Sequence, residues 1–305
     1  MSSRFQIGPE VEAALSAGLP VLALESTIMT HGMPWPVNLE TVRQAEQVIR
    51  EANVLPATIA IVDGVARVGL EDHELERLAR SGAELAKCSR RDLSSLLTAG
   101  ATAGTTVAAT MMLAHRAGIR VFATGGIGGV HRDAAMTFDV SADLLELART
   151  PVAVVCAGPK AILDIGLTRE YLETLGVPVI GFRTDDLPAF YCRRSGFPVD
   201  YRLDSVADIA ELMGVHDELS LEQGMVIANP IARAHALDET ELEELLSAAL
   251  GQATDARVVG KELTPFLLQK IEEMTGGASL DANVALMLSN ARLGAEISAA
   301  LCSAN

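Results

Sequence analysis

The sequence predicts an α/β fold: a single α/β/α layered domain over residues 1–305 with a mixed, largely parallel central sheet. Hydrophobic residues make up 49% of the chain and aromatic residues only 4%, a composition typical of compact aliphatic layers. Apolar runs rich in valine, such as residues 151–157, are bounded by glycine or proline, which is typical of strands buried on both faces of a sheet. Such runs alternate with amphipathic helical patterns, and no repeat or long linker divides the chain.

The composition excludes several classes of protein. The formal net charge of −16 repels polyanions, so we do not expect a nucleic-acid polymer as a partner. The four cysteines (Cys88, Cys156, Cys192 and Cys302) have no CxxC or Cys/His spacing, so neither a zinc site nor a disulfide framework is predicted. The first residues lack an apolar core of signal-peptide length, and no run approaches the roughly 18 apolar residues of a membrane span. We therefore expect a cytoplasmic protein with no membrane partner.

A strand, a helix and a hairpin are expected first. Residues 20–25 predict a short buried strand that ends in the carboxylate of Glu25. After Pro36, apolar residues recur at three- and four-residue spacing to about Asn53, which predicts an amphipathic helix covering the sheet. Asp63-Gly64 then separates two apolar runs as a type I′ turn does, which predicts an antiparallel hairpin of residues 57–62 and 65–70.

Short elements follow, up to a buried helix. Residues 71–80 predict a charged helix, and residues 83–89 predict a brief strand or turn that presents Lys87. Ser89 is expected to cap the next helix. Residues 104–117 are small and apolar on nearly every side, which is typical of a helix packed between layers, with its two methionines in the core.

A glycine-rich loop comes next. Residues 119–124 predict a strand that ends at Thr124 and leads into Gly125–Asp133. The glycines would let backbone N–H groups approach an anion. The loop matches neither the Walker pattern nor GxGxxG followed by a ribose-binding acid, so its own signal for phosphate binding is weak.

Two aspartates stand four residues apart where the next helix begins. Ser141 is expected to cap a helix over residues 142–149, with Asp139 before it and Asp143 in its first turn. Carboxylates at this position either complement the helix dipole or hold a hard cation. The residues alone leave both interpretations open.

Lys160 is the candidate nucleophile. It follows the apolar run and Gly158-Pro159, and Pro159 suits the first turn of a helix, which we expect to run to about Leu175. Lys160 would then lie outside the carboxyl end of a strand, where open α/β sheets bind ligands. Apolar walls and the positive end of the helix dipole would favour its neutral amine, which is the nucleophilic form. The alternatives are a surface lysine or one that only holds a phosphate.

The α/β alternation continues to the end of the chain. We expect strands over residues 177–182 and 224–229, on either side of an irregular stretch and a helix over residues 205–214. The tail is expected to be helical, from 238 to 250 and from 264 to 301, with Asn283 buried among apolar neighbours.

Five motifs, in their order along the chain, closely resemble the pseudouridine-5′-phosphate glycosidase family. They are Leu24–Pro34, Ala103–Val107, Phe122–His131, Phe138–Asp143 and Cys156–Lys160. The resemblance covers nearly the full length and implies a homotrimer with one divalent cation, Mn2+ in the family. It also implies a C-glycosidase that reversibly cleaves pseudouridine 5′-phosphate to uracil and ribose 5-phosphate. Some members of the family have a fused sugar-kinase domain, for which this chain has no room.

The resemblance implies roles for individual residues. The family's lysine nucleophile matches Lys160, its proton donor matches Glu25, and its single protein ligand to the metal matches Asp139. Thr124 is added to the site because it ends a predicted strand beside them. The further positions that match substrate-binding or site-lining residues of the family are Lys87, Val107, His131, Ser141, Ala142, Asp143 and Asn283.

The C–C glycosidic bond explains why an amine is needed. The bond has no leaving heteroatom, so protonation between two carboxylates, the usual glycosidase chemistry, does not suffice. Glu25 would help to open the ribose ring, Lys160 would add at C1′ to form an imine, and the bond to uracil C5 would break in a retro-aldol-type step. A Schiff-base aldolase or lyase on another sugar phosphate would also use Lys160. A non-catalytic nucleotide-phosphate sensor would use Lys160 and Lys87 for the phosphate alone.

These assignments predict a particular geometry. The strand ends at Glu25, Thr124 and Lys160 should line one pocket. Asp139 should be the only side chain bonded to the metal, with water as the other ligands. The phosphate should be bound by a cation and by backbone or capping donors: Lys87, Gly125, Gly126 and Ser141.

Overall fold

The computed structural model describes residues 4–258, 260 and 263–304. Within these residues an eleven-stranded sheet has the order β1-β4-β3-β2-β7-β9-β13-β11-β12, with β6 on β3 and β5 on β6. Its strands are β1 (Phe5–Ile7), β2 (Val21–Leu24), β3 (Leu55–Val62), β4 (Val65–Val68), β5 (Ala86–Cys88), β6 (Ala103–Thr105), β7 (Val121–Ala123), β9 (Ala153–Cys156), β11 (Val179–Phe182), β12 (Tyr201–Leu203) and β13 (Met225–Ala228). A second, antiparallel pair consists of β8 (Val130–His131) and β10 (Leu163–Asp164).

The direction of the strands confirms the predicted mixed, largely parallel sheet. From β3 to β12 in the sheet order, each strand runs parallel to its neighbour. The antiparallel pairs of this sheet join β3 to β4 and β3 to β6. The hairpin between β3 and β4 turns at Asp63 (φ 48°) and Gly64 (φ 75°), as the type I′ pattern predicts.

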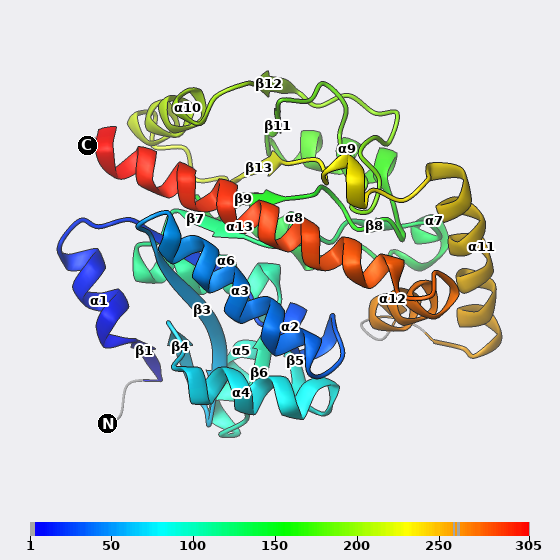
Figure 1. Ribbon diagram of the computed structural model, residues 1–305, viewed down its shortest axis with the longest axis horizontal. Coiled ribbons are helices and arrows are strands. Elements are labelled where there is room, and N and C mark those ends of the chain that lie inside the picture. The colour runs from blue at the N-terminus through cyan, green and yellow to red at the C-terminus, as the bar shows by residue number, and fades with distance from the viewer. Residues whose placement is uncertain (1–3, 259, 261–262, 305) are drawn as a thin grey trace.

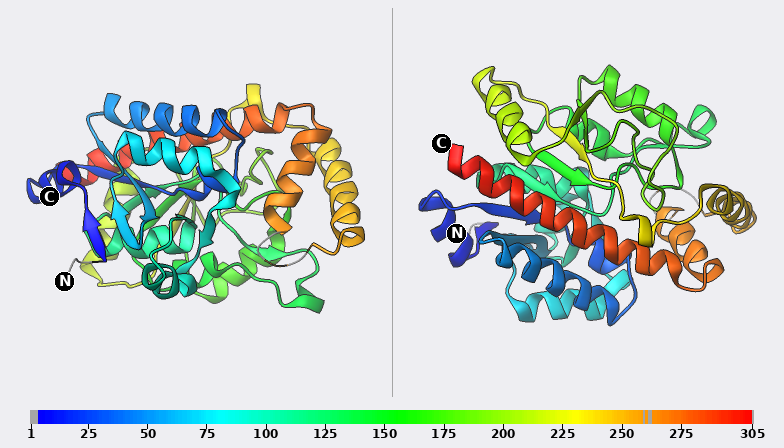
Figure 2. Two further views of the ribbon diagram at one scale, coloured as in Figure 1. Left: turned by 90° about the horizontal axis from the view of Figure 1, so that it is seen from below. Right: turned by 45° about the horizontal axis from the view of Figure 1, so that its top comes forward.

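Helices cover both faces of the sheet (Figure 1). On one face lie α2 (Thr27–His31), α3 (Val37–Glu51), α4 (Asp72–Ser81), α10 (Val206–Glu218) and α13 (Ala278–Ala304), while α11 (Glu239–Asp255) and α12 (Leu263–Met274) join the same hydrophobic core from beyond the end of the sheet. The other face is covered by α1 (Pro9–Ser16), α5 (Leu93–Thr98), α6 (Val107–Ala117), α8 (Ala142–Leu147) and α9 (Ile165–Thr174). The start of α1 and the end of α13 lie at one end of the molecule, and α11 and α12 lie at the other (Figure 2).

Alternate residues of a strand belong to different cores. Leu22 and Leu24 of β2 pack with α3 and α13, whereas Val21 and Ala23 pack with the helices of the opposite face. All four residues of β9 are buried, which confirms the two-sided burial predicted for residues 151–157. The continuous valine-rich run is therefore the signature of a strand between two helical layers.

Two sequence predictions need correction, and the first concerns residues 104–117. The helix begins only at Val107, because Ala103–Thr105 forms β6 and pairs with β3 and β5. A Cβ atom at Gly104 would lie 2.2 Å from Oγ1 of Thr30, so close packing, not helical propensity, decides the conformation here.

The second correction concerns Pro159. No helix begins there, and α9 starts at Ile165 with Asp164 as its N-cap. Gly158 has a φ of 82°, and its missing Cβ would lie 2.0 Å from the carbonyl oxygen of Pro188. The backbone N–H of Lys160 donates to the carbonyl of Ile127 (3.0 Å), so the segment follows the glycine-rich loop instead of turning into a helix. The helix dipole therefore has no part in the chemistry of Lys160.

None of the described helices has the length and apolar character needed to cross a lipid bilayer.

Candidate active site

The site lies where the sheet reverses its order. From β2 the chain moves to β3 on one side, and from β7 it moves to β9 on the other. Open α/β sheets bind ligands outside the carboxyl ends of the strands at such a switch point. Glu25 directly follows β2, and Thr124 directly follows β7.

Two threonines hold the carboxylate of Glu25. The hydroxyl of Thr124 donates to Oε1, and the hydroxyl of Thr27 donates to Oε2. Glu25 is 4% exposed, so these two hydroxyls take the place that water has around a surface carboxylate. The acid is therefore fixed in orientation before any substrate arrives.

Two pockets meet at Glu25. We call the one lined by Phe190 and Asn283 the inner pocket and the one lined by Arg91 and Ser141 the outer pocket. The inner pocket is the narrower of the two, and the outer pocket has a volume of about 330 Å³. Five residues line both of them: Glu25, Thr27, Lys87, Lys160 and Thr264. The predicted acid and the predicted nucleophile thus lie at the junction of the two pockets.

The inner pocket combines apolar walls with one amide. Ile28, Phe190 and Leu268 form walls, and Asn283 reaches the pocket from α13. Asn283 is only 5% exposed, and its Oδ1 has no hydrogen-bond partner among the described residues. Because buried polar atoms are normally paired, this oxygen is suited to accept a hydrogen bond from a ligand.

The outer pocket is lined by charged groups of both signs: the cations Lys87, Arg91 and Lys160, and the carboxylates Glu25, Asp139 and Asp143. It brings Arg91 together with Lys87, the start of α6 at Val107 and the capping residue Ser141. The Arg91 side chain is 79% exposed, so it can move to meet a ligand. The sequence reasoning missed Arg91, although it follows Lys87 by four residues.

Asp143 supports the wall of the outer pocket. Its Oδ1 accepts from the backbone N–H of Ala108 (3.0 Å) and its Oδ2 from that of Gly128 (2.9 Å). A Cβ atom on Gly128 would lie 2.1 Å from Oγ of Ser141, so only glycine lets the loop approach the start of α8 this closely. Asp143 therefore joins the beginnings of α6 and α8 to the glycine-rich loop.

An ion pair between partly exposed Arg90 and buried Glu146 connects the segment of Lys87 and Arg91 to the same wall. Glu146 of α8 is fully buried and accepts two hydrogen bonds from Arg90 (2.6 and 2.8 Å), with Arg149 and Thr150 as further donors. Burial acts to raise the pKa of Glu146, but these donors outweigh it and the pKa is lowered. Arg90 lies between Lys87 and Arg91, so the pair holds this segment against α8.

Asp139 is a partly exposed carboxylate that lines the outer pocket. Its side chain is 32% exposed, and Nε2 of His131 lies 4.0 Å from its Oδ2. Within the described part of the chain, no three His, Cys, Asp or Glu side chains are grouped to hold a metal. A single carboxylate fits a cation that keeps most of its water ligands, and the predicted role of Asp139 stays a prediction.

Cys156 does not compete with Lys160 as a nucleophile. It ends β9, is fully buried, and burial raises the pKa of its thiol to about 12. The thiol thus stays protonated at neutral pH, whereas nucleophilic attack by cysteine needs the thiolate. Lys160, four residues later and partly exposed, is the group at this strand end that is open to a ligand.

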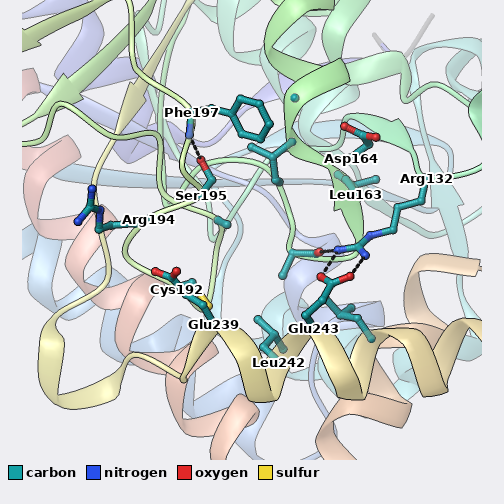
Figure 3. Close-up of a pocket in the computed structure, with 15 residues that line it drawn as sticks. Arg132, Leu163, Asp164, Cys192, Arg194, Ser195, Phe197, Glu239, Leu242 and Glu243 are labelled. Carbon is teal, nitrogen blue, oxygen red and sulfur yellow. Dashed lines mark hydrogen bonds and ion pairs between the residues drawn. The ribbon is translucent and has the colours of Figure 1, made fainter.

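A larger cavity, of about 420 Å³, lies between α11 and the β10–α9 segment. Figure 3 shows Arg132 paired with Glu243 of α11 at this cavity, with Phe197 and Cys192 on other walls. None of the residues predicted for the site lines it. Size alone therefore does not identify the reactive site.

The inner and outer pockets together contain every site residue that the sequence predicts. Glu25, Lys87 and Lys160 line both pockets, Thr124 and Asn283 line the inner one, and the outer one is lined by Val107, His131, Asp139, Ser141, Ala142 and Asp143. The convergence of Glu25, Thr124 and Lys160 on one pocket is confirmed, while the chemical roles of the residues stay predictions. Side chains that the sequence reasoning did not single out are Thr27, His31, Ser89, Arg91, Thr106 and Phe190.

The predicted group of phosphate donors is divided by the structure. Gly125 and Gly126 line the inner pocket, whereas Ser141 lines the outer one. The loop meets Ser141 at Gly128 and at Gly129, whose carbonyl accepts from the backbone N–H of Ser141 (2.9 Å). Lys87 and Arg91 line the same pocket as Ser141, whereas Gly125 and Gly126 do not.

The chain is similar in sequence to proteins of a known family over nearly its whole length. The family described as Indigoidine synthase A like protein matches residues 10–300. The protein named pseudouridine-5′-phosphate glycosidase from Hahella chejuensis is 55% identical over 299 residues, 98% of this chain and 99% of the relative. A protein of the same name from Escherichia coli K12 is 54% identical over 292 residues, 96% of this chain and 94% of the relative.

Two solved structures have the same fold, each with a TM-score of 0.90. The prealnumycin C-glycosynthase AlnA, solved in complex with ribulose 5-phosphate, is 40% identical and covers 98% of this chain and 97% of its own. An indigoidine synthase A-like protein from Thermotoga maritima is 36% identical and covers 99% of this chain and 98% of its own.

Proposed function

The chain belongs to the pseudouridine-5′-phosphate glycosidase family, and we propose that it reversibly cleaves pseudouridine 5′-phosphate to uracil and ribose 5-phosphate. The observation that carries this proposal is the place of Glu25 and Lys160 at the junction of two pockets: an inner one with apolar walls and the Asn283 amide, and an outer one with the cations Lys87 and Arg91 and the carboxylate of Asp139. A nucleotide whose reacting bond joins base to sugar needs its acid and its nucleophile at such a junction.

The two pockets suit the two halves of the substrate. The inner pocket takes uracil, whose ring packs against Phe190 and whose N–H groups supply the donor that Oδ1 of Asn283 lacks. The outer pocket takes the ribose 5-phosphate, with Lys87 and Arg91 as charged partners of the phosphate. This orientation places C1′ beside Lys160.

The reaction proceeds through an amine adduct. Glu25 delivers a proton as the C1′–O4′ bond of the ribose opens, with electrons supplied by the uracil ring, and the amine of Lys160 then adds to C1′. When the bond from C1′ to uracil C5 breaks, C5 keeps the electron pair and takes a proton, and the nitrogen lone pair forms the C1′ imine. Water hydrolyses the imine, which releases ribose 5-phosphate and restores Lys160. Because C1′ has four single bonds in the adduct with Lys160, the imine forms during C–C cleavage and not before it.

A divalent cation completes the proposed site. Asp139 and water would hold it in the outer pocket, and Mn2+ is the metal that the family resemblance implies. Its charge would offset part of the charge of the phosphate dianion. The groups of the chain that bind, orient and move protons are those described above.

Uracil release tests the proposal. Incubation with pseudouridine 5′-phosphate and Mn2+ is expected to change the ultraviolet absorbance as uracil forms, and the Lys160→Ala variant should be silent. Borohydride capture of a different sugar phosphate on Lys160, without uracil release, would point to an aldolase or lyase. Binding of the nucleotide without capture or turnover would point to a phosphate sensor.

The assembly and cellular location belong to the same proposal. The family resemblance implies a homotrimer, and the net charge of −16 disfavours a nucleic-acid polymer as partner. We expect the trimer in the cytoplasm. Light scattering after size-exclusion chromatography at micromolar concentration tests the trimer, and a monomer would contradict it.

A further inference from the structure

A carboxamide of the last helix lies behind the acid of the site. Asn290 of α13 is fully buried, and its Nδ2 donates to the carbonyl oxygens of Thr124 (2.8 Å) and Gly125 (3.3 Å). β7 ends at Ala123, so these two carbonyls lie just beyond the strand. Asn290 therefore holds the backbone at the point where Thr124 turns its hydroxyl to Glu25.

A second carboxamide orients the first. Nδ2 of Asn229 donates to Oδ1 of Asn290 (2.9 Å) and to Oγ of Ser289 (3.1 Å). The backbone N–H of Asn229 donates to the carbonyl of Cys156 (2.8 Å) at the end of β9. The two amides thus connect α13 to the carboxyl ends of β7, β9 and β13.

Stability alone does not explain this pair. Burying two carboxamides is costly, and their hydrogen bonds roughly repay that cost without adding much. Apolar residues could fill the same volume, as they do along most of the buried face of α13, for example at Leu286, Ala291 and Leu293. An amide at position 290 can orient the backbone as an apolar side chain cannot, because its N–H groups fix where the carbonyls of Thr124 and Gly125 lie.

We propose that Asn290, held by Asn229, is a positioning residue that sets the Thr124 hydroxyl against the carboxylate of Glu25. The inference rests on the proposed function, because it assigns Glu25 to the C-glycosidase reaction. Asn290 lines neither the inner nor the outer pocket, so it would act through Thr124 and not by contact with the substrate. On this proposal, the orientation of Glu25, near the start of the chain, depends on the packing of α13, the last helix, against the sheet.

The test is the Asn290→Leu variant of the full chain, assayed with pseudouridine 5′-phosphate. We expect kcat to fall by about tenfold or more and KM to change by less than about threefold, because the substrate contacts remain while the acid is misplaced. The matched control is Ser298→Ala on α13, whose buried hydroxyl bonds within the helix to Gly294 (2.9 Å). The control should keep the wild-type kcat. An active wild type with an unchanged kcat in Asn290→Leu would overturn the inference alone, whereas an inactive wild type would overturn the proposed function and this inference with it.

Two further variants separate positioning from folding. Asn229→Ser keeps Asn290 but removes the amide that orients it, and a loss of kcat with an unchanged KM is expected even if Asn290→Leu does not fold. A double-mutant cycle tests the route through Thr124. If Asn290 acts through Thr124, the Thr124→Val variant has already lost most of the effect on kcat, and adding Asn290→Leu to it should lower kcat by less than about a further threefold. The proposed route through Thr124 would be overturned if the losses of kcat in Thr124→Val and Asn290→Leu multiplied in the double variant. It would also be overturned if Asn229→Ser had the kcat of the wild type.

Discussion

The hydroxyl of Thr124 donates a hydrogen bond to Oε1 of Glu25, although 99 residues separate them in the chain. Their strands explain the contact. β2 and β7 are parallel neighbours in which Ala23 pairs with Phe122 and Leu24 with Ala123, so the next residues in register are Glu25 and Thr124. The acid and the group that orients it are therefore aligned by the register of two buried strands.

The threonines that hold Glu25 are expected to support catalysis. Thr124→Val and Thr27→Val should each lower kcat by at least about tenfold, because an unheld carboxylate loses the orientation that proton transfer needs. The measurement is steady-state release of uracil. Thr254→Val, an exposed position on α11, serves as the control with wild-type kcat. If both site variants stay within about twofold of the wild type, the orientation of Glu25 does not limit the reaction.

The cations of the outer pocket are expected to give specificity for the monophosphate. A hydrogen bond to a charged group contributes about 1.5–3 kcal/mol, so Lys87→Ala and Arg91→Ala should each lower kcat/KM for the nucleotide by about 10- to 100-fold. Both should affect the unphosphorylated nucleoside far less, and the nucleoside should be a very poor substrate of the wild type. Arg202→Ala, an exposed ion-paired arginine on β12, is the control. Equal losses for nucleotide and nucleoside would place the phosphate elsewhere.

The ion pair behind this pocket should make stability depend on pH. The pKa of Glu146 in the folded protein is lowered from 4.5, so its ion pair stabilises the fold above that pH and loses its effect as the pH falls through the lowered value. Glu146→Gln should therefore reduce the free energy of unfolding by about 2 kcal/mol at pH 7 and by clearly less in acid.

Urea unfolding at pH 7 and at acid pH measures this difference. Glu40→Gln, at an exposed position of α3, should change the free energy of unfolding by less than about 0.5 kcal/mol at either pH. A Glu146→Gln effect that is the same at both pH values would show that the lost interaction is not ionic.

The metal ligand is expected to be Asp139. Asp139→Asn should weaken binding of Mn2+ by at least about tenfold, because the single negatively charged ligand of a water-rich site is lost. Electron paramagnetic resonance of free Mn2+ measures the affinity without any assay of activity. Asp133→Asn, exposed in the same loop, should bind Mn2+ like the wild type. Unaltered affinity in the Asp139 variant would refute the assignment.

The sequence predicts which strand ends come together better than it predicts the backbone around them. Glu25, Thr124 and Lys160 were identifiable because buried strands end in polar residues, and parallel strands bring those ends to one edge. The helix expected at Pro159 does not form, because Gly158 packs against Pro188, 30 residues later in the chain. The helical propensity of a short segment carries no information about a contact with a residue so far away in the chain.

Other parts of the site have no local signature. Arg91 looks like any exposed arginine until β5 and β6 bring its segment to the start of α6. Asn290 looks like one polar residue in an apolar helix until α13 packs against β7 and β9 (Figure 1) and brings its amide to the carbonyl of Thr124. Both depend on how distant elements pack, which no short stretch of sequence determines.

The central claim is that Lys160 forms a covalent bond with the sugar. Borohydride added during turnover of pseudouridine 5′-phosphate, followed by peptide mass spectrometry, should find a reduced ribose 5-phosphate adduct on Lys160. Lys160→Ala should show neither the adduct nor C–C cleavage of nucleotide or nucleoside, while its affinity for Mn2+ stays that of the wild type. Uracil release by the wild type without an adduct on Lys160, or uracil release by Lys160→Ala at the wild-type rate, would contradict the account.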